Sequence, residues 1–272
     1  MNKSRFFLIC ALLIWSLAPM IWQVYTSFSS ATSLVEPFNG QVNQWTLDNY
    51  RQVLNSDPPF WRYILNSTFV GASSTLLTLI FAIPASYSIV RLPIRVAKLV
   101  KIYLLGAALF PYVLLFLALL EVARTLNLGN NLLALTLPYS ALSMPLAVLL
   151  LSSAFRDIPL ELEEAARLEG LGLWQRLRWV LIPLITPATA STSILVFLFS
   201  WNEYPIALTW LSRTELLTLP VAMARIAGSS VYSIPYGAFA AATVLGALPL
   251  LLLVLIFQRQ IVSGLTSGAI KG

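Results

Sequence analysis

The sequence predicts an all-helical integral membrane protein with six transmembrane helices. Its 272 residues are 58% hydrophobic and only 10% charged, and the mean hydropathy of +0.80 lies well above the range of soluble domains. The apolar residues also gather into six segments of about 20 residues, the length with which a helix crosses the hydrocarbon core of a bilayer. We therefore expect the chain to bury its apolar surface in lipid rather than in an ordinary core.

Each of the six expected spans contains a proline or adjoins one. A proline inside a spanning helix frees a carbonyl group and bends the helix, which neighbouring helices or an internal cavity must accommodate. Irregular helix packing and a bent wall around a pathway both explain this pattern, and the sequence leaves the two interpretations open. The expected spans are Phe6 to Phe28, Leu65 to Val90, Ile102 to Leu120, Leu132 to Phe155, Leu181 to Asn202 and Pro235 to Phe257.

The segments between the spans complete the expected layout. The first apolar run lacks a small-residue cleavage site, so we expect a span there and not a signal peptide. Residues 29–63 are mostly polar and predict an external loop with short helices. The fairly apolar run between the fifth and sixth spans is interrupted by Pro220, Arg225 and Gly228, which predicts a loop near the membrane surface and no seventh span.

The distribution of positive charge orients the spans. Six spans place both termini on one side, and most of the 17 Lys and Arg residues fall on that side. The positive-inside rule makes this side, and both termini, cytoplasmic. Because topology explains the basic balance of the chain, we expect no nucleic-acid partner. The Lys and Arg residues of the opposite side are Arg51, Arg62, Arg124, Arg213 and Arg225.

This layout divides the chain into three parts. Residues 1–62 hold the first span and the external loop, residues 63–258 form a core of five spans, and residues 259–272 form a cytoplasmic tail. The chain has no His and a single Cys, Cys10, inside an apolar run. This composition excludes disulfide frameworks and Cys/His metal sites, and we expect no metal site.

One cytoplasmic loop, residues 156–180, carries a large share of the charge. Asp157 and Pro159 stand where a helix would begin, as its cap and its first-turn proline. Glu163 and Arg167 are spaced four apart, as in ion pairs along a helix. The two alanines between them keep this helix thin enough for another surface to approach closely.

A second short helix is expected after two glycines. Gly170 and Gly172 break the first helix and predict a hinge. The apolar side of the second helix carries Leu171, Trp174, Leu177 and Leu181. Two short helices that project from the membrane predict either a docking element for a partner or a solvated interfacial loop.

A family signature lies in this loop. Its residues are Glu164, Ala165, Ala166, Gly170, Val180, Ile182 and Pro183. They resemble the pattern E-A-A, three residues, G, nine residues, I-x-L-P of bacterial binding-protein-dependent ABC importer permeases, with two conservative aliphatic replacements. The stretches "ILNSTFVG", "PASYSIVR", "FSWNEYPIAL", "LLTLPVA" and "FQRQIVSGLTSGAIKG" extend the likeness over nearly the whole chain, toward the MalG-like carbohydrate permeases.

The resemblance implies a type I ABC importer permease fold in the bacterial cytoplasmic (inner) membrane. The implied cargo is a sugar or sugar-like solute, such as an oligosaccharide, glycoside or polyol. The implied partners are a second, MalF-like permease, two ATPase subunits, a periplasmic or lipid-anchored solute-binding protein and membrane lipids. The residues implied to couple this chain to the ATPase are Glu163, Glu164, Ala165, Ala166, Arg167, Gly170 and Pro183.

The resemblance also implies two further contacts. The tail, from about Gln258, resembles a segment that inserts along the ATPase dimer interface, with a plain basic end as the alternative. The loop with Gly228, Ser229 and Ser230 resembles one that enters the solute-binding protein, with an ordinary turn as the alternative.

The chain is not expected to hydrolyse ATP. It has no G-x-x-x-x-G-K-[ST] motif, and the nearest stretch, "GLTSGAIKG", lacks the Lys-[Ser/Thr] pair and a following helix. We therefore expect no cofactor in this chain and assign ATP and Mg to the partner ATPase subunits.

The candidate residues of a substrate path lie on the third and fifth spans, and helix packing is the alternative for each. Glu203 is expected at the outer end of the fifth span, in reach of water, because a carboxylate at the bilayer centre is costly. We interpret it as an outer-gate or partner contact. Members of the maltose type place most sugar contacts on the other permease. The candidates are Tyr112, Ser193, Trp201, Asn202 and Glu203.

Two other classes of membrane protein are alternatives. An ion-coupled secondary transporter usually has ionisable residues inside its spans and internal repeats, and this sequence shows neither. A membrane enzyme would need a convergent cluster of His, Asp or Glu, which is also missing from the sequence.

The expected orientation predicts which loops face outward. A single cysteine introduced at Ser56 or Ser230 should react with a membrane-impermeant thiol reagent added to intact cells, and one at Gln175 should not. Labelling of Gln175→Cys from outside would overturn the orientation.

Overall fold

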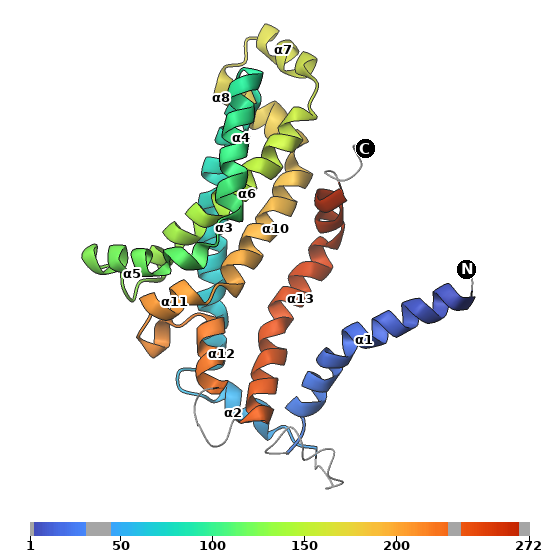
Figure 1. Ribbon diagram of the computed structural model, residues 1–272, viewed down its shortest axis with the longest axis vertical. Coiled ribbons are helices and arrows are strands. Elements are labelled where there is room, and N and C mark those ends of the chain that lie inside the picture. Colours follow the sequence, from blue (N-terminus) through green and yellow to red (C-terminus); the bar gives the residue numbers. More distant parts are fainter. Residues whose placement is uncertain (1–2, 31–44, 228–234, 267–272) are drawn as a thin grey trace. The chain divides into compact units, whose positions relative to one another are not determined.

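A computed structural model describes residues 3–30, 45–227 and 235–266 (Figure 1). Within these ranges the regular structure is helical, apart from one isolated bridge between Ser29 and Trp45. Short 3-10 turns lie at Tyr112–Leu115 and Thr214–Leu216, and a π-helical segment at Leu177–Leu181. The helices are α1 (Lys3–Ser27), α2 (Asp48–Leu54), α3 (Phe60–Val90), α4 (Ile94–Leu109), α5 (Phe116–Thr125), α6 (Leu132–Arg156), α7 (Leu160–Leu168), α8 (Leu173–Arg176), α9 (Ile182–Leu184), α10 (Thr186–Asn202), α11 (Pro205–Trp210), α12 (Leu219–Ala227) and α13 (Tyr236–Thr266).

The helices fit the predicted membrane fold. Four of them, α1, α3, α6 and α13, are each long and apolar enough to cross a membrane. Two bent pairs, α4 with the helical stretch up to Thr125 and α8–α9 with α10, pass the same test together, which gives up to six spans in the described residues. The all-helical membrane class predicted from the sequence is confirmed.

The third expected span, Ile102 to Leu120, is broken in the structure. Helix α4 ends at Leu109, and Phe110 is extended, with φ −66° and ψ 130°. The helical stretch from Tyr112 to Thr125 then leaves at 79° to α4. The break falls at Pro111, which has no N–H to donate and disfavours helical geometry in the residue before it.

The fifth expected span, Leu181 to Asn202, also bends, and its longer straight part, α10, begins at Thr186. The stretch Leu173–Leu184 meets α10 at 80°, and the bend lies at Ile185. Pro187 stands in the first turn of α10, where a missing N–H costs no helical hydrogen bond. A proline therefore lies beside each break. The sequence predicted bent spans, but it did not predict bends as large as 79° and 80°.

Two predictions about the connections are confirmed. The segment between the first two spans contains the short helix α2. The apolar run before the last span contains α12, which has 9 residues and is too short to cross a bilayer. Helix α3 starts at Phe60, before the predicted Leu65, and α13 continues to Thr266, beyond the predicted Phe257.

The described residues fall into two compact units, which we describe separately. The first unit comprises residues up to 65 and residues 217–251. Here Asn49 of α2 donates to the carbonyl oxygens of Ser27 and Ser29, at 3.0 and 2.9 Å. The apolar window of α1 has no buried residue, and Trp15 is among its most exposed side chains. This surface is the kind that a helix presents to lipid or to another membrane subunit.

The second unit comprises residues 66–216 and those from 252 onward. Its core contains side chains of α3, α6, the π-helical segment and α10, including Ala82, Leu151, Phe155 and Leu181. Small polar residues join α3 to α6: Ser86 Oγ donates to Val148 O at 3.1 Å. Such residues let membrane helices approach closely and hydrogen-bond across the interface.

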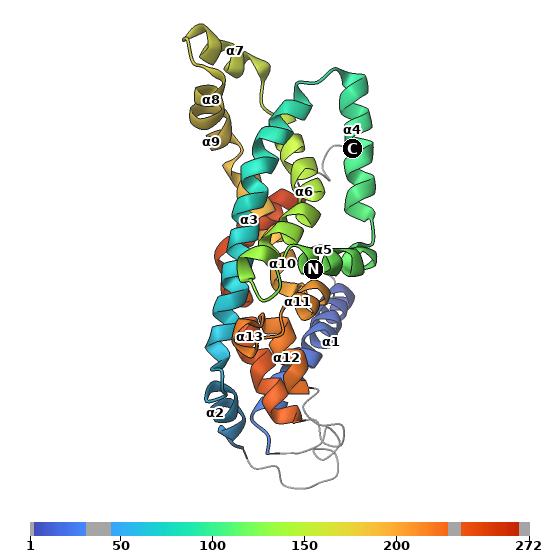
Figure 2. The ribbon, with the colours of Figure 1, turned by 90° about the vertical axis from the view of Figure 1, so that its left-hand side faces the viewer.

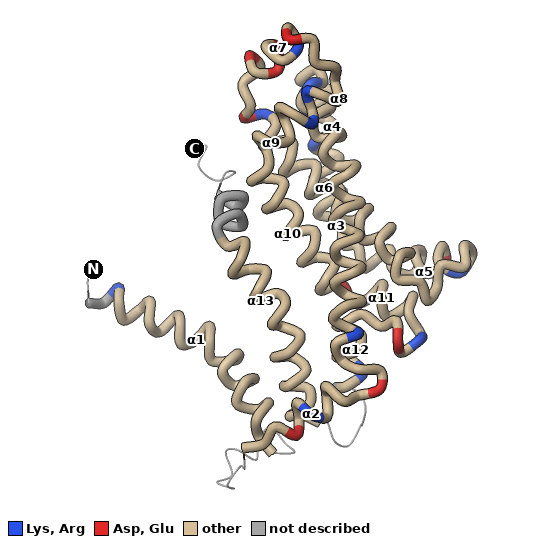
Figure 3. Tube along the Cα trace, turned by 180° about the vertical axis from the view of Figure 1, so that it is seen from behind, with Lys and Arg blue, Asp and Glu red and all other residues tan. Residues whose placement is uncertain are grey.

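Charged residues lie mainly at the two ends of the second unit. Figure 2 shows α7 and α8 at one end, while α5 and α11 lie toward the other. In Figure 3 the Lys, Arg, Asp and Glu residues gather at these ends, and the helices between them are almost entirely without charge. An uncharged band between two charged ends is the pattern that a bilayer imposes.

The close approach of α3 and α10 can be tested at Gly71. A Cβ atom on Gly71 would lie 2.8 Å from Cε2 of Phe197, whose ring also packs on Trp201 at a centroid distance of 5.5 Å. We expect Gly71→Ala to lower the free energy of unfolding by about 1–3 kcal/mol, because the ring must shift. Gly106→Ala is the matched control, since nothing lies within 4 Å of its added Cβ. Thermal unfolding of the detergent-solubilised protein measures both, and equal losses would argue against the contact.

Candidate functional site

Helix α7 holds the centre of the signature loop. Its N-cap position is Pro159, with extended ψ of 136°, and its first turn carries Glu161 and Glu163 near the positive end of the helix dipole. The prediction that Asp157 caps this helix is wrong. Asp157 instead occupies the C-cap of α6, and Pro159 precedes the first helical turn of α7.

Gly170 ends α7 through a defined backbone motif. Its φ of +83° is left-handed, its N–H donates to Arg167 O at 3.0 Å, and the next N–H, of Leu171, donates to Ala166 O at 3.1 Å. This pair of bonds is a Schellman motif, which satisfies the last carbonyl groups of the helix and favours Gly. The predicted glycine hinge is therefore a fixed helix end in the structure. No atom lies within 4 Å of a Cβ built on Gly170, so a side chain would meet no neighbour there. Glycine is favoured because of the positive φ angle.

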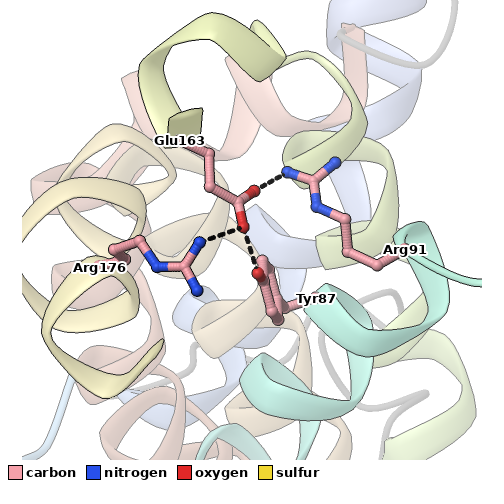
Figure 4. Close-up of polar contacts among 4 residues, drawn as sticks. All are labelled: Tyr87, Arg91, Glu163 and Arg176. Atoms are coloured by element: carbon pink, nitrogen blue, oxygen red, sulfur yellow. Dashed lines mark hydrogen bonds and ion pairs between the residues drawn. The ribbon is translucent and has the colours of Figure 1, made fainter. Parts of the chain in front are cut away.

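The carboxylate of Glu163 is the most heavily bonded group of the loop. It accepts hydrogen bonds from the Tyr87 hydroxyl and from Arg91, and Arg176 Nη1 lies 3.3 Å from Oε1 (Figure 4). The Glu163 side chain is only 10% exposed. These four residues, from the end of α3, from α7 and from α8, form what we call the Glu163 cluster. The expected pairing of Glu163 with Arg167 is wrong, because the carboxylate points inward to these partners.

The other signature residues of α7 divide between two faces. Ala166 is buried, whereas Glu164, Ala165 and Arg167 are exposed. Leu168, the last residue of α7, is 89% exposed. We call Glu164, Ala165, Arg167 and Leu168 the exposed face of α7. This face is thin at Ala165 and combines one anion, one cation and an uncovered leucine.

The second helix of the loop differs from its prediction. Leu177 and Leu181 are buried as expected, but Trp174 is 72% exposed. A π-helical segment, Leu177–Leu181, lies between α8 and α9, and its extra residue shifts the register between Trp174 and Leu181. Arg176 pairs with Glu163. Pro183 lies beyond this segment, on α9, and is exposed.

A cavity of about 590 Å³ lies in the second unit. Among its lining residues are Tyr112 and Phe110, at the break after α4, and Phe199 of α10. The Tyr112 and Phe199 rings meet edge to face, with centroids 5.5 Å apart. The lining contains no Lys, Arg, Asp or Glu. It consists of Tyr103, Gly106, Ala107, Ala108, Phe110, Tyr112, Leu115, Ala141, Leu142, Ser143, Pro145, Leu146, Leu195, Val196 and Phe199.

Of the five predicted path residues, only Tyr112 lines this cavity. Ser193 donates to Thr189 O within α10 at 2.7 Å. Trp201 is buried against Phe197, and Asn202 donates back to Leu198 O at 2.8 Å. These three side chains pack on or cap the helix that carries them.

Glu203 corrects the sequence interpretation most clearly. The residue is 2% exposed and does not reach water. Its carboxylate accepts from Tyr139 Oη at 2.5 Å and from the N–H groups of Ile206 and Ala207 at 2.9 and 3.1 Å. The N–H groups belong to the first turn of α11, so Glu203 caps that helix. Three hydrogen bonds explain how a carboxylate is tolerated in a buried place.

Several residues of these sites were not among the predicted ones. Tyr87 and Arg91 are four residues apart at the end of a span and precede an acidic loop, a signal that could have found them. Ser143 gave no signal: its Oγ is buried beside the cavity and has no hydrogen-bond partner in the described part of the chain. The predicted contact loop of Gly228, Ser229 and Ser230 lies outside the described residues.

Known proteins match this chain over nearly its whole length. The family model for the binding-protein-dependent transport system inner membrane component matches residues 44–267. The sulfoquinovosyl glycerol transport system permease protein SmoH of Agrobacterium fabrum is 37% identical over 98% of this chain and 93% of its own length. The trehalose transport system permease protein SugB of Mycobacterium tuberculosis is 36% identical over 95% of this chain and 93% of its own.

A solved structure shares the fold. The crystal structure of a bacterial ABC transporter involved in the import of the acidic polysaccharide alginate contains a chain that matches with a TM-score of 0.77 and 22% identity, over 95% of this chain and 98% of that one. The family model and the two relatives show that this chain belongs to the binding-protein-dependent transport system inner membrane components, the permeases of ABC importers.

Proposed function

We propose that this chain is one of two permease subunits of an ATP-driven importer for a sugar or sugar-like solute, in the bacterial inner membrane. The observation that carries the proposal is the exposed face of α7. A short helix with a thin, uncovered side stands at the charged end of an apolar helical unit. Relatives named as permeases for sulfoquinovosyl glycerol and for trehalose support the class of solute.

The exposed face of α7 is the proposed seat of an ATPase subunit. Leu168 supplies uncovered apolar area, and Ala165 lets a cleft close around the helix. Glu164 and Arg167 add charges that orient the contact. The sequence lacks a phosphate-binding motif, so ATP and Mg belong to the partner and the chain itself catalyses no reaction.

The remaining partners follow from the same assembly. A second permease would complete the pathway and cover helices such as α1, whose apolar window is unburied here. A solute-binding protein would deliver the sugar from outside the membrane, with the loop of Gly228, Ser229 and Ser230 as its proposed contact. A solved alginate transporter is described in complex with a substrate-bound periplasmic protein, which supports this arrangement.

The cavity beside the break at Pro111 is the proposed part of the pathway in this subunit. Aromatic rings of Phe110, Tyr112 and Phe199 offer faces and edges for a sugar ring, and the buried Ser143 hydroxyl offers one polar partner. Because no charged side chain lines it, the wall fits the uncharged ring of a sugar and offers no ion partner to a charged substituent. Ion-coupled transport is less well supported, since the carboxylate of Glu203 is already satisfied by three hydrogen bonds.

The exposed face of α7 predicts a separation of assembly from docking. Ala165→Trp adds bulk and Glu164→Lys reverses a charge at the proposed seat. Each should lower ATPase attachment and substrate-stimulated ATP hydrolysis by about tenfold or more, the effect of about 1.4 kcal/mol at an interface centre. Membrane insertion and pairing with the second permease should stay normal, because both residues lie outside the spans.

Co-purification of the ATPase and uptake by reconstituted vesicles measure this prediction. Lys98→Glu is the matched control, since it reverses an exposed charge on α4, away from the loop. Normal attachment and uptake in both α7 variants would leave α7 a solvated connector and remove the main support for the proposal.

A role of the cavity in the pathway predicts that substitutions in its wall change the apparent affinity for the solute. Tyr112→Ala should raise the solute concentration for half-maximal uptake by about three- to tenfold, the range of a lost aromatic contact. Tyr112→Phe should leave it nearly unchanged, because the ring and its contact with Phe199 remain. Uptake curves of the whole complex measure both. Equal uptake by all three proteins would place the sugar contacts on the other permease.

A further inference from the structure

We propose that the Glu163 cluster positions span α3 relative to α7, so that movement of α7 by the ATPase reaches α3 directly. Glu163 is then a positioning residue for transport and not a contact of the ATPase. This inference rests on the proposed function, because it needs a partner that moves α7.

The chain connects α7 to two spans but not to α3. Helix α6 leads into α7 through residues 157–159, and α7 leads through α8 and α9 into α10. Helix α3 continues into α4 instead. Tyr87 and Arg91 are 76 and 72 residues away from Glu163 along the chain. Their bonds to Glu163 are therefore a side-chain route from α7 to α3 that the backbone does not supply.

The geometry of the cluster fixes orientation as well as distance. Oε2 of Glu163 is taken by Arg91, whereas Oε1 accepts from Tyr87 and lies 3.3 Å from Arg176 Nη1. Both carboxylate oxygens therefore have partners, and rotation of α7 about its axis would separate the carboxylate from its donors. Apolar packing resists separation of two helices but tolerates sliding, whereas charge-assisted hydrogen bonds are directional.

The ring of Tyr87 ties the cluster to the core. It meets the Phe155 ring edge to face at a centroid distance of 5.8 Å, and the Arg91 guanidinium lies 5.5 Å from the centre of the Tyr87 ring. Phe155 belongs to the last turn of α6. A displacement of α7 is therefore passed to α3 and to the end of α6 through groups in contact.

The charges of the cluster decide which substitutions are informative. One carboxylate faces two guanidinium groups, so Glu163→Gln leaves Arg91 and Arg176 close together without compensation. The double variant Tyr87→Phe with Arg91→Met removes both donors at the end of α3 but keeps the ring at position 87 on Phe155 and the pair of Glu163 with Arg176. This variant removes the hydrogen bonds between Glu163 and the end of α3, while the Glu163 carboxylate keeps Arg176 as its charge partner.

The test uses the whole complex reconstituted in vesicles, with its ATPase, second permease and solute-binding protein. For the double variant we expect normal ATPase attachment, because the exposed face of α7 is untouched. Solute transported per ATP hydrolysed should fall about fivefold or more, the lower end of the range for coupled sites. Tyr87→Phe with Arg91→Lys, which keeps one cation in reach of Glu163, should restore part of this ratio. Arg95→Gln, which removes an exposed guanidinium of α4, is the matched control.

The outcomes separate positioning from folding and from failure of the proposed function. An unchanged ratio of solute to ATP in the double variant overturns the inference, even if less complex assembles, because the cluster then only stabilises the fold. A lowered ratio with intact attachment supports it. If the wild-type complex shows no ATP-driven sugar uptake at all, the proposed function fails, whatever the variants do.

Discussion

The structure depends on one constraint, which is that a backbone in lipid must satisfy its own hydrogen bonds. Helices satisfy them within each segment, which accounts for a described chain built almost wholly of helices. The constraint also decides where the chain breaks its spans. Both large bends have a proline close by, so at least one N–H is missing already, and the first bend opens beside a cavity. Within a membrane, irregular backbone is tolerated where it is buried in protein or lines a cavity.

The same constraint explains how much of the fold could be predicted. Apolar length depends only on local sequence, so the class of fold and the approximate positions of the apolar helices followed from counting. The bend angles did not, because a proline permits a break but neighbouring helices set its direction. The end of α7 at Gly170 was predictable from a single glycine, while its nature, a fixed Schellman motif, was not. A pattern of glycines does not distinguish a hinge from a cap.

The candidate site was predictable where the function lies along one helix and not where it depends on tertiary contacts. Glu164 and Ala165 were assigned through the resemblance of their local pattern to a family signature, and both are exposed in the structure. Glu163 has the same local surroundings, yet its carboxylate turns inward because Tyr87, Arg91 and Arg176 converge on it from other elements. Glu203 is the second case. The sequence predicted a side chain in reach of water, but in the structure the carboxylate is buried and accepts hydrogen bonds from Tyr139 and from the first turn of α11. In both cases the hydrogen-bond donors that allow the carboxylate to be buried lie on other elements or in the turn that follows it.

The uncharged wall around Tyr112 and Phe110 has an energetic consequence for the cell. Moving one elementary charge across a membrane involves work of about 2.3 kcal/mol for each 100 mV of potential. A neutral sugar that passes such a wall carries no charge, so the membrane potential neither assists nor opposes its entry. The whole free energy of ATP hydrolysis is then available to work against the concentration gradient, and the accumulation that the importer reaches becomes independent of how strongly the membrane is energised.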